Sequence, residues 1–150
     1  SSACLYTAGR GSMSNVQKGR INKARWFMQD RPSFLKQLRK EISNAIKLCK
    51  KFGYIPCFRL NGTSDIAWEN YGIIQDFPDV QFYDYTKVYK RALKYVNGHL
   101  PSNYHITYSL NEDNRAEAFK FSANSPGWRP RNYLQWIPPR SVSLRYTYRY

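Results

Sequence analysis

Apolar and polar residues along this chain alternate with two different periods, and the changes between them predict the order of elements. Between residues 33 and 52, apolar side chains recur every three or four positions, which is typical of an amphipathic helix. Shorter patterns of the same kind predict further helices at about 14–28, 66–74, 86–96 and 115–122. A mainly apolar run predicts a buried strand at 55–60, and strands are also predicted at 80–85 and 104–110. An alternating stretch at 142–148 adds a candidate edge strand.

Each of the three predicted strands is followed by a polar loop and then by a helical pattern, at intervals of about 25 residues. This rhythm predicts an α/β fold built from βα units, with a small, mainly parallel sheet of three to four strands flanked by helices. Three strands are too few for a closed barrel, so we expect an open sheet or part of a barrel. We expect the α/β domain to cover residues 1–123, and residues 124–150 to form a tail that packs on it or is partly ordered.

Polar side chains gather where the first two predicted strands end. Because the carboxyl ends of parallel strands lie at one edge of a sheet, we expect these side chains to share a pocket. Asp65 and Asp84 are candidates for a metal ligand or a catalytic base, and Lys87 for a phosphate contact. Further pocket candidates are Arg59, Asn61, Thr63, Glu69 and Thr86. The alternative is a turn with helix-capping residues, which needs no function.

Charge points to a different kind of function. The chain has 24 Lys and Arg against 10 Asp and Glu, a formal net charge of +14. Such a balance favours a polyanionic partner, above all DNA or RNA, although it also serves solubility or an acidic protein partner. The candidate contacts are four basic residues of the domain and four residues of the tail, where arginine and aromatic residues alternate: Arg10, Lys90, Arg91, Lys94, Trp128, Arg129, Arg131 and Trp136.

Cysteine spacing predicts no complete metal site. Cys4, Cys49 and Cys57 are far apart, and the chain has no CxxC, HxH or HExxH pattern. We expect Cys49 and Cys57 to be small buried hydrophobes in a reducing compartment. No apolar run approaches the ~18–20 residues of a membrane span, so we expect no membrane partner.

Four separated motifs, 4–11 (CLYTAGRG), 58–69 (FRLNGTSDIAWE), 82–87 (FYDYTK) and 103–109 (NYHITYS), carry a family resemblance. Over roughly residues 3–120 the chain resembles the phage and plasmid proteins called "gene product 88"-like. The resemblance implies a phage or plasmid origin and a place in the host-cell cytoplasm, but no particular reaction. Family members carry further cysteines upstream of the position of Cys4. Cys4 is therefore a partial metal or iron–sulfur ligand at most, in a full-length form, and no cofactor is otherwise evident.

Two functions remain open on this reading, besides a structural or packaging role for which the sequence offers nothing distinctive. One is a nucleic-acid-binding accessory protein that uses lysine-rich helix faces and the arginine-rich tail. The other is an enzyme, or the remnant of one, with its pocket at the strand ends. The sequence offers no complete nucleophile and base pair and no metal triad, which places the enzyme second. His105 begins its predicted strand, so we expect it at the opposite edge of the sheet from Asp65 and Asp84.

Overall fold

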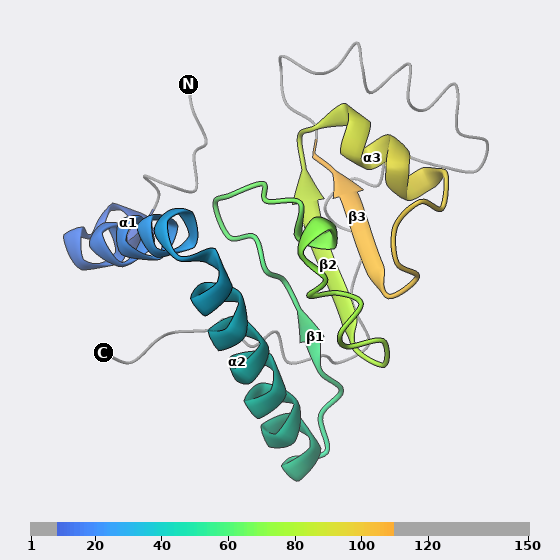
Figure 1. Cartoon of the computed structure of the whole chain (residues 1–150), viewed down its shortest axis with the longest axis horizontal. Coiled ribbons are helices and arrows are strands. Elements are labelled where there is room, and N and C mark those ends of the chain that lie inside the picture. Colours follow the sequence, from blue (N-terminus) through green and yellow to red (C-terminus); the bar gives the residue numbers. More distant parts are fainter. Residues whose placement is uncertain (1–8, 110–150) are drawn as a thin grey trace. The chain divides into compact units, whose positions relative to one another are not determined.

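The computed structural model describes residues 9–109, with side chains from Gly11 onward, and the chain divides into two compact units at residues 47 and 48. The elements confirm the predicted α/β order (Figure 1). They are η1 (Gly9–Ser12), α1 (Ser14–Gln29), α2 (Arg31–Lys51), β1 (Cys57–Phe58), η2 (Trp68–Tyr71), β2 (Gln81–Thr86), α3 (Tyr89–Val96) and β3 (Tyr104–Tyr108). The predicted helix 115–122, strand 142–148 and boundary after residue 123 lie outside the described residues.

The first unit consists of α1 and most of α2, which meet through aromatic side chains. The ring of Phe34 on α2 packs edge-on against Trp26 and Phe27 of α1, with centroids 5.2 and 5.4 Å away. Asp30 separates the two helices, and its carboxylate accepts a hydrogen bond from the Ser33 backbone N–H at 3.1 Å. This is the usual way to satisfy a donor in the first turn of a helix. The two helices are therefore joined by a single capping residue.

The second unit contains the sheet, whose strands are all parallel in the order β1-β2-β3. The parallel sheet was predicted, but β1 is much shorter than the predicted strand 55–60. It pairs with β2 only at Cys57 and Phe58. Beyond Phe58 the backbone leaves the ladder, and the Asn61 N–H is bonded to the Asp84 side chain instead of a main-chain carbonyl. Where β1 ends, the Asp84 side chain thus accepts the hydrogen bond that a main-chain carbonyl of β2 would otherwise accept.

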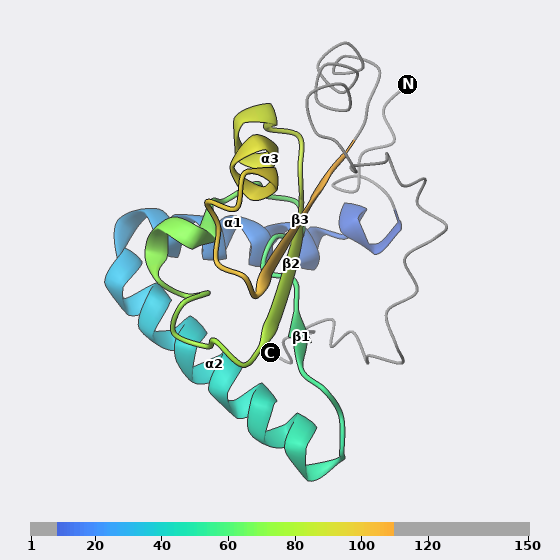
Figure 2. The ribbon, with the colours of Figure 1, turned by 90° about the vertical axis from the view of Figure 1, so that its right-hand side faces the viewer.

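One face of the sheet holds the core of this unit. Alternate residues of β2 and β3 are buried on this face: Phe82, Asp84, Thr86, Tyr104, Ile106 and Tyr108. Figure 2 shows α3 and the connection that contains η2 on the same side of the sheet. Ala92 of α3 packs with Tyr108 in a small apolar cluster. Both crossovers therefore cover the face from which Asp84 and Thr86 project.

Two predicted helices are shorter than expected. The helix predicted at 66–74 is reduced to η2, because Gly72 adopts the left-handed conformation (φ 75°) and ends it. The helix predicted from residue 86 begins only at Tyr89, since Thr86 still pairs with Tyr108 in the sheet. The Thr86 hydroxyl also accepts a hydrogen bond from the Val88 N–H at 3.0 Å. A left-handed glycine therefore shortens the first helix, and pairing in the sheet delays the start of the second.

Candidate functional site

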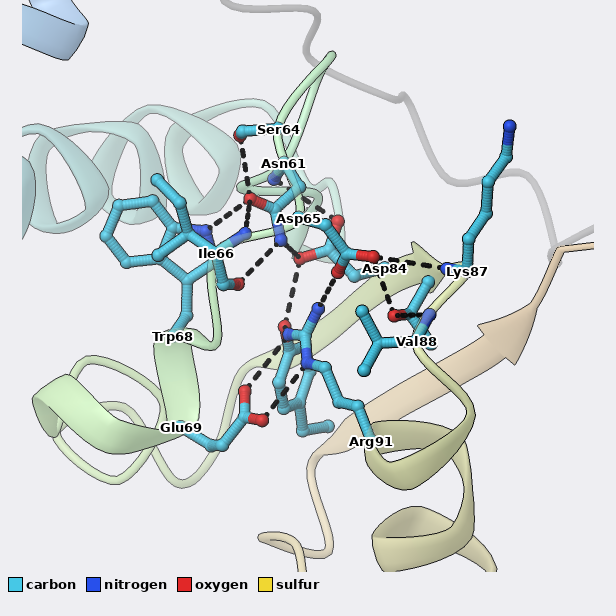
Figure 3. A network of polar contacts seen from close by, with 12 residues as sticks. Asn61, Ser64, Asp65, Ile66, Trp68, Glu69, Asp84, Lys87, Val88 and Arg91 are labelled. Atoms are coloured by element: carbon cyan, nitrogen blue, oxygen red, sulfur yellow. Dashed lines mark hydrogen bonds and ion pairs between the residues drawn. The ribbon is translucent and has the colours of Figure 1, made fainter.

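Asp84 and Asn61 meet at the carboxyl-terminal edge of β1 and β2. The Asn61 N–H donates to Asp84 Oδ1 at 3.2 Å, and Asn61 Nδ2 donates to Asp84 Oδ2 at 2.9 Å. Both residues are buried, and Asp84 is 0% exposed. The loop after β1 is therefore fastened to β2 through a carboxylate and an amide (Figure 3).

The Asn61 side chain organises the loop that follows it. Its Oδ1 accepts hydrogen bonds from the Ser64 hydroxyl, the Ile66 N–H and the Trp68 indole N–H at 2.9 to 3.0 Å. Its Nδ2 donates to the Ile66 carbonyl at 2.9 Å as well as to Asp84. An amide offers two donors and an acceptor oxygen, so this side chain has no hydrogen-bonding capacity left for a ligand.

Arg91 of α3 reaches into the same edge and joins three elements. Its Nε and Nη2 donate to the two carboxylate oxygens of Glu69, each at 3.0 Å, and its Nη1 donates to Asp65 at 2.6 Å. Nη2 also donates to the Tyr104 hydroxyl, which in turn donates to Asp84 Oδ2 at 2.9 Å. The guanidinium is thus linked through one phenol to the Asp84 carboxylate.

Asp65 connects this network to the start of α3. Its Oδ2 accepts hydrogen bonds from the Thr86 hydroxyl at 2.7 Å and from the Lys87 backbone N–H at 3.1 Å. Asp65 therefore does not cap η2, and the residue at that cap is Ala67. The carboxylate instead holds the end of β2 and the first turn after it.

Burial sets the protonation of this edge. Burial raises the pKa of Asp84 to about 6, although the Tyr104 hydroxyl, Arg91, the Asn61 N–H and Arg59 all act to lower it. Burial by itself would lower the pKa of Arg91, but the hydrogen bonds that it donates to Glu69 and Asp65, with the charges of Tyr104 and Glu69, leave it above its ordinary value. Burial and the Asp84 carboxylate raise the pKa of Tyr104. Arg91 and Tyr104 are therefore fixed donors, and Asp84 is the one of the three with a pKa near neutral pH.

The predicted pocket residues are brought together only in part. Asn61, Asp65, Glu69, Asp84 and Thr86 form the network, as their positions at the strand ends suggested. Arg59 lies at its margin, with Nε 3.8 Å from Asp84 and its guanidinium 4.7 Å from the Tyr85 ring centroid. Thr63 is exposed and lies outside the network. Lys87 contributes its backbone N–H, while its side chain points away (Figure 3).

The sequence assigned no site role to Tyr104, Ser64 or Trp68, and it placed Arg91 on a nucleic-acid surface. Arg91 is 5% exposed, and its guanidinium forms ion pairs with the carboxylates of Asp65 and Glu69. Its side chain therefore does not belong to a basic surface. One signal was present, because Arg91 is the single arginine among the basic residues of 87–94. Arginine binds carboxylates in a two-point geometry that lysine cannot form.

The other candidate nucleic-acid contacts differ in exposure and in whether they lie among the described residues. Lys90 and Lys94 of α3 are exposed. Arg10 lies in η1, in the part of the chain whose side chains are not described. Four tail candidates, Trp128, Arg129, Arg131 and Trp136, lie outside the described residues, as does Cys4. His105 is exposed and contacts the Tyr95 hydroxyl, and it takes no part in the network.

Within residues 9–109, no group of three or more His, Cys, Asp or Glu is arranged to hold a metal ion. Cys49 is buried and Cys57 is half-buried, and both are free thiols. None of the helices in this range is long and apolar enough to cross a membrane. The Arg91 guanidinium lies between the carboxylates of Asp65 and Glu69, where a cation would otherwise be needed.

The polar groups of the network are satisfied by one another. Each carboxylate of the network is bonded to a guanidinium, a hydroxyl or an N–H group, and fully satisfied polar networks of this kind make structure rigid and specific. It fastens the loop after β1 to β2, α3 and β3. The arrangement therefore determines how α3 is held on the sheet, and so which face of that helix is presented to solvent.

Comparison with known families identifies the chain. The family model described as "Gene product 88" matches residues 1–132, and the chain belongs to this family. Comparison with curated proteins and with solved structures found no match. Three of the four motifs that suggested the family, 58–69, 82–87 and 103–109, supply every member of the network except Arg91 and Val88.

Proposed function

We propose that this protein is a nucleic-acid-binding accessory protein of a phage or plasmid, acting in the host-cell cytoplasm. The observation that carries the proposal is the distribution of charge. Residues 9–47 hold ten Lys and Arg and only two acids, whereas residues 48–109 hold seven and five. A concentration of positive charge in one helical segment is the usual electrostatic footprint of a nucleic-acid-binding surface.

Helix α2 carries its buried residues and its exposed lysines on opposite faces. Ile42, Ala45 and Cys49 are buried, while Lys36, Lys40 and Lys47 are exposed. With 3.6 residues per turn, these three lysines fall in one stripe on the side away from the buried residues. The acid of this helix, Glu41, accepts a hydrogen bond from Gln37 Nε2 at 3.0 Å. The stripe can therefore follow a phosphate backbone.

Helix α3 offers a second, smaller set of lysines. Arg91 faces the sheet and holds the helix there, which leaves Lys90 and Lys94 on the exposed side. These two lysines are one turn apart, at positions i and i+4, so their side chains are neighbours. The buried network supports this function indirectly, because it fixes the orientation in which these lysines face solvent.

Salt-dependent binding tests the proposal. Affinities of the full chain for single- and double-stranded DNA and RNA are measured by fluorescence anisotropy at several salt concentrations, after removal of co-purified nucleic acid. The triple variant Lys36→Gln/Lys40→Gln/Lys47→Gln is expected to reduce the slope of log affinity against log salt by about 2 to 3 on duplex DNA. The matched control, Lys36→Arg/Lys40→Arg/Lys47→Arg, keeps the charge and should keep the slope. Absence of salt-sensitive binding to all four nucleic acids contradicts the proposal.

A second candidate function is catalysis at the strand ends. It is favoured by the complete burial of Asp84 at the strand ends, which raises the pKa of this carboxyl to about 6, a value that suits a group that exchanges protons near neutral pH. Asp65 is the more accessible carboxylate of the network, with a side chain 30% exposed. If a phosphate-ester hydrolysis is detected, Asp65→Asn and Asp84→Asn should each abolish it. Retained turnover in both variants removes the site from the reaction.

A further inference from the structure

The turn that joins α2 to β1 presents large apolar side chains to solvent. Phe52, Tyr54 and Ile55 are 58%, 49% and 75% exposed, within a stretch of four residues. Single exposed apolar residues are normal, but adjacent ones mark interaction sites. We call residues 50–55 the α2–β1 turn; it lies wholly within the second unit (Figure 1).

Backbone hydrogen bonds fix the shape of this turn. The Tyr54 N–H donates to the Cys49 carbonyl at 2.8 Å, and the Gly53 N–H donates to the Lys50 carbonyl at 3.2 Å. Gly53 has φ 70°, so the helix ends in the Schellman arrangement, which a glycine adopts without strain. The rings of Phe52 and Tyr54 are held with centroids 6.3 Å apart and planes 32° from each other. Two aromatic rings thus stand exposed on a backbone of defined shape.

The charge around these rings is positive. Lys50 and Lys51 occupy the last turn of α2, and both are exposed. Lys51 Nζ lies 5.9 Å from the centroid of the Phe52 ring. No acidic residue occurs between Glu41 and Asp65 in the sequence. The rings are therefore accompanied by two ammonium groups and by no acid of their own segment.

We propose that the α2–β1 turn is a stacking site for the bases of single-stranded nucleic acid, with Phe52 and Tyr54 as the platform and Lys50 and Lys51 as phosphate contacts. This inference rests on the proposed function and adds the strand type and the site. Every base has a flat π-face, so aromatic rings beside lysines bind single strands without reading their sequence. In a duplex these faces are already stacked. A second copy of the chain is a poorer occupant, because two such turns would bring four lysines together.

The test compares two oligonucleotides with the same number of phosphates. One is an oligothymidine, and the other is an abasic strand of equal length, which keeps the charge and lacks the faces that stack. The wild-type chain is expected to bind oligothymidine on the order of tenfold to a hundredfold more tightly than the abasic strand. Phe52→Ala/Tyr54→Ala should remove this preference and leave affinity for the abasic strand unchanged. The ring-retaining variant Phe52→Tyr/Tyr54→Phe should keep it.

The outcomes separate this inference from the proposed function. No binding to either strand contradicts the proposed function itself. Equal binding of both strands by the wild type, or a preference that survives Phe52→Ala/Tyr54→Ala, overturns the stacking site and leaves the basic helices in place. The same proteins are examined by sedimentation without nucleic acid. Self-association of the wild type that disappears in the alanine variant assigns the turn to contact between copies and also overturns the inference.

Discussion

Arg91 holds Glu69 through two parallel hydrogen bonds, Nε to Oε1 and Nη2 to Oε2, each 3.0 Å long. The pair links α3 to η2 across 22 positions of sequence, and both side chains are buried, at 5% and 7% exposed. A buried charge pair of this kind contributes little net stability over an apolar pair, but loss of one partner leaves the other charge buried and uncompensated. The two residues are therefore much more sensitive to substitution than their surface neighbours.

Glu69→Ala is expected to lower the free energy of unfolding by about 3 kcal/mol, at the low end for a broken buried pair. The loss is at the low end because Arg91 keeps Asp65 as a carboxylate partner and loses only the two-point contact with Glu69. Urea denaturation at neutral pH measures the change. Lys90→Ala, on the exposed side of the same helix, is the control and should stay within about 0.5 kcal/mol of wild type. Equal effects of the two substitutions would show that the pair does not stabilise the fold.

Asp84 should make stability depend on pH. Its pKa of about 6 in the folded chain lies above the ordinary value of 3.8, so the folded state binds the proton more tightly than the unfolded state between these pH values. The contribution of Asp84 to the free energy of unfolding therefore falls as pH rises from about 4 to about 6, by roughly 3 kcal/mol in total. Below pH 4 this loss is absent, and above pH 6 it is complete.

The variant Asp84→Asn isolates this effect, because it cannot ionise. The difference in unfolding free energy between wild type and Asp84→Asn, from urea titrations at several pH values, should shift against the wild type across the window from 4 to 6. Asp79→Asn, at an exposed acid outside the network, gives the background change. A difference that stays constant with pH would mean that Asp84 titrates in the folded chain as it does in the unfolded one.

A substitution at Asn61 can change the charge of the network with almost no change in side-chain volume. In Asn61→Asp, a carboxylate oxygen replaces the amide nitrogen that lies 2.9 Å from Asp84 Oδ2. Two carboxylates so close cannot both be ionised without a large cost, and one pKa is strongly raised. We expect Asn61→Asp to be clearly less stable at pH 7 than at pH 4.5 relative to wild type, as measured by thermal unfolding. Asn61→Ala removes the amide donor to Asp84 without adding charge, so its relative gain at low pH should be clearly smaller than that of Asn61→Asp.

Lys90 and Lys94 should report on phosphate binding by α3. In Lys90→Gln/Lys94→Gln, the slope of log affinity against log salt on duplex DNA is expected to fall by roughly 1 to 2. Stability should be unchanged, since both side chains are exposed. The charge-retaining variant Lys90→Arg/Lys94→Arg provides the comparison. A slope that is the same in all three proteins would remove α3 from the binding surface.

The sequence predicted the parallel sheet and its edge well, for a definite reason. Polar residues lie at or after the end of each of the first two predicted strands, so Asn61, Asp65, Asp84 and Thr86 were placed at one edge before their contacts were known. The two short helices were overestimated, because a period of apolar residues does not show where a glycine such as Gly72 or a side-chain bond at Thr86 interrupts it.

The pattern of apolar and polar residues could not predict the hydrogen-bond partners of these side chains. Tyr104 begins β3, and only the register, which pairs it with Phe82, brings its hydroxyl within reach of Asp84. Strand order also mattered. Ligand crevices form where the order of parallel strands reverses, whereas β1, β2 and β3 follow one another without reversal. Among the described strands, the polar side chains therefore meet each other instead of a ligand.

The shortness of β1 has a consequence for motion. Beyond Phe58, the loop after β1 is held to β2 and α3 by side chains of Asn61, Asp65 and Arg91 rather than by a backbone ladder. Proteins open locally in cooperative units, so a loop held by a few side-chain contacts can open while the sheet stays intact. The Asn61 amide proton is bonded to the Asp84 side chain, and the Ile66 amide proton is bonded to the Asn61 side chain. We therefore expect both protons to exchange with solvent at the rate at which these side-chain hydrogen bonds open. Because Asp84 accepts two of these hydrogen bonds, we expect its protonation to change that rate and so to make the lifetime of the closed loop depend on pH.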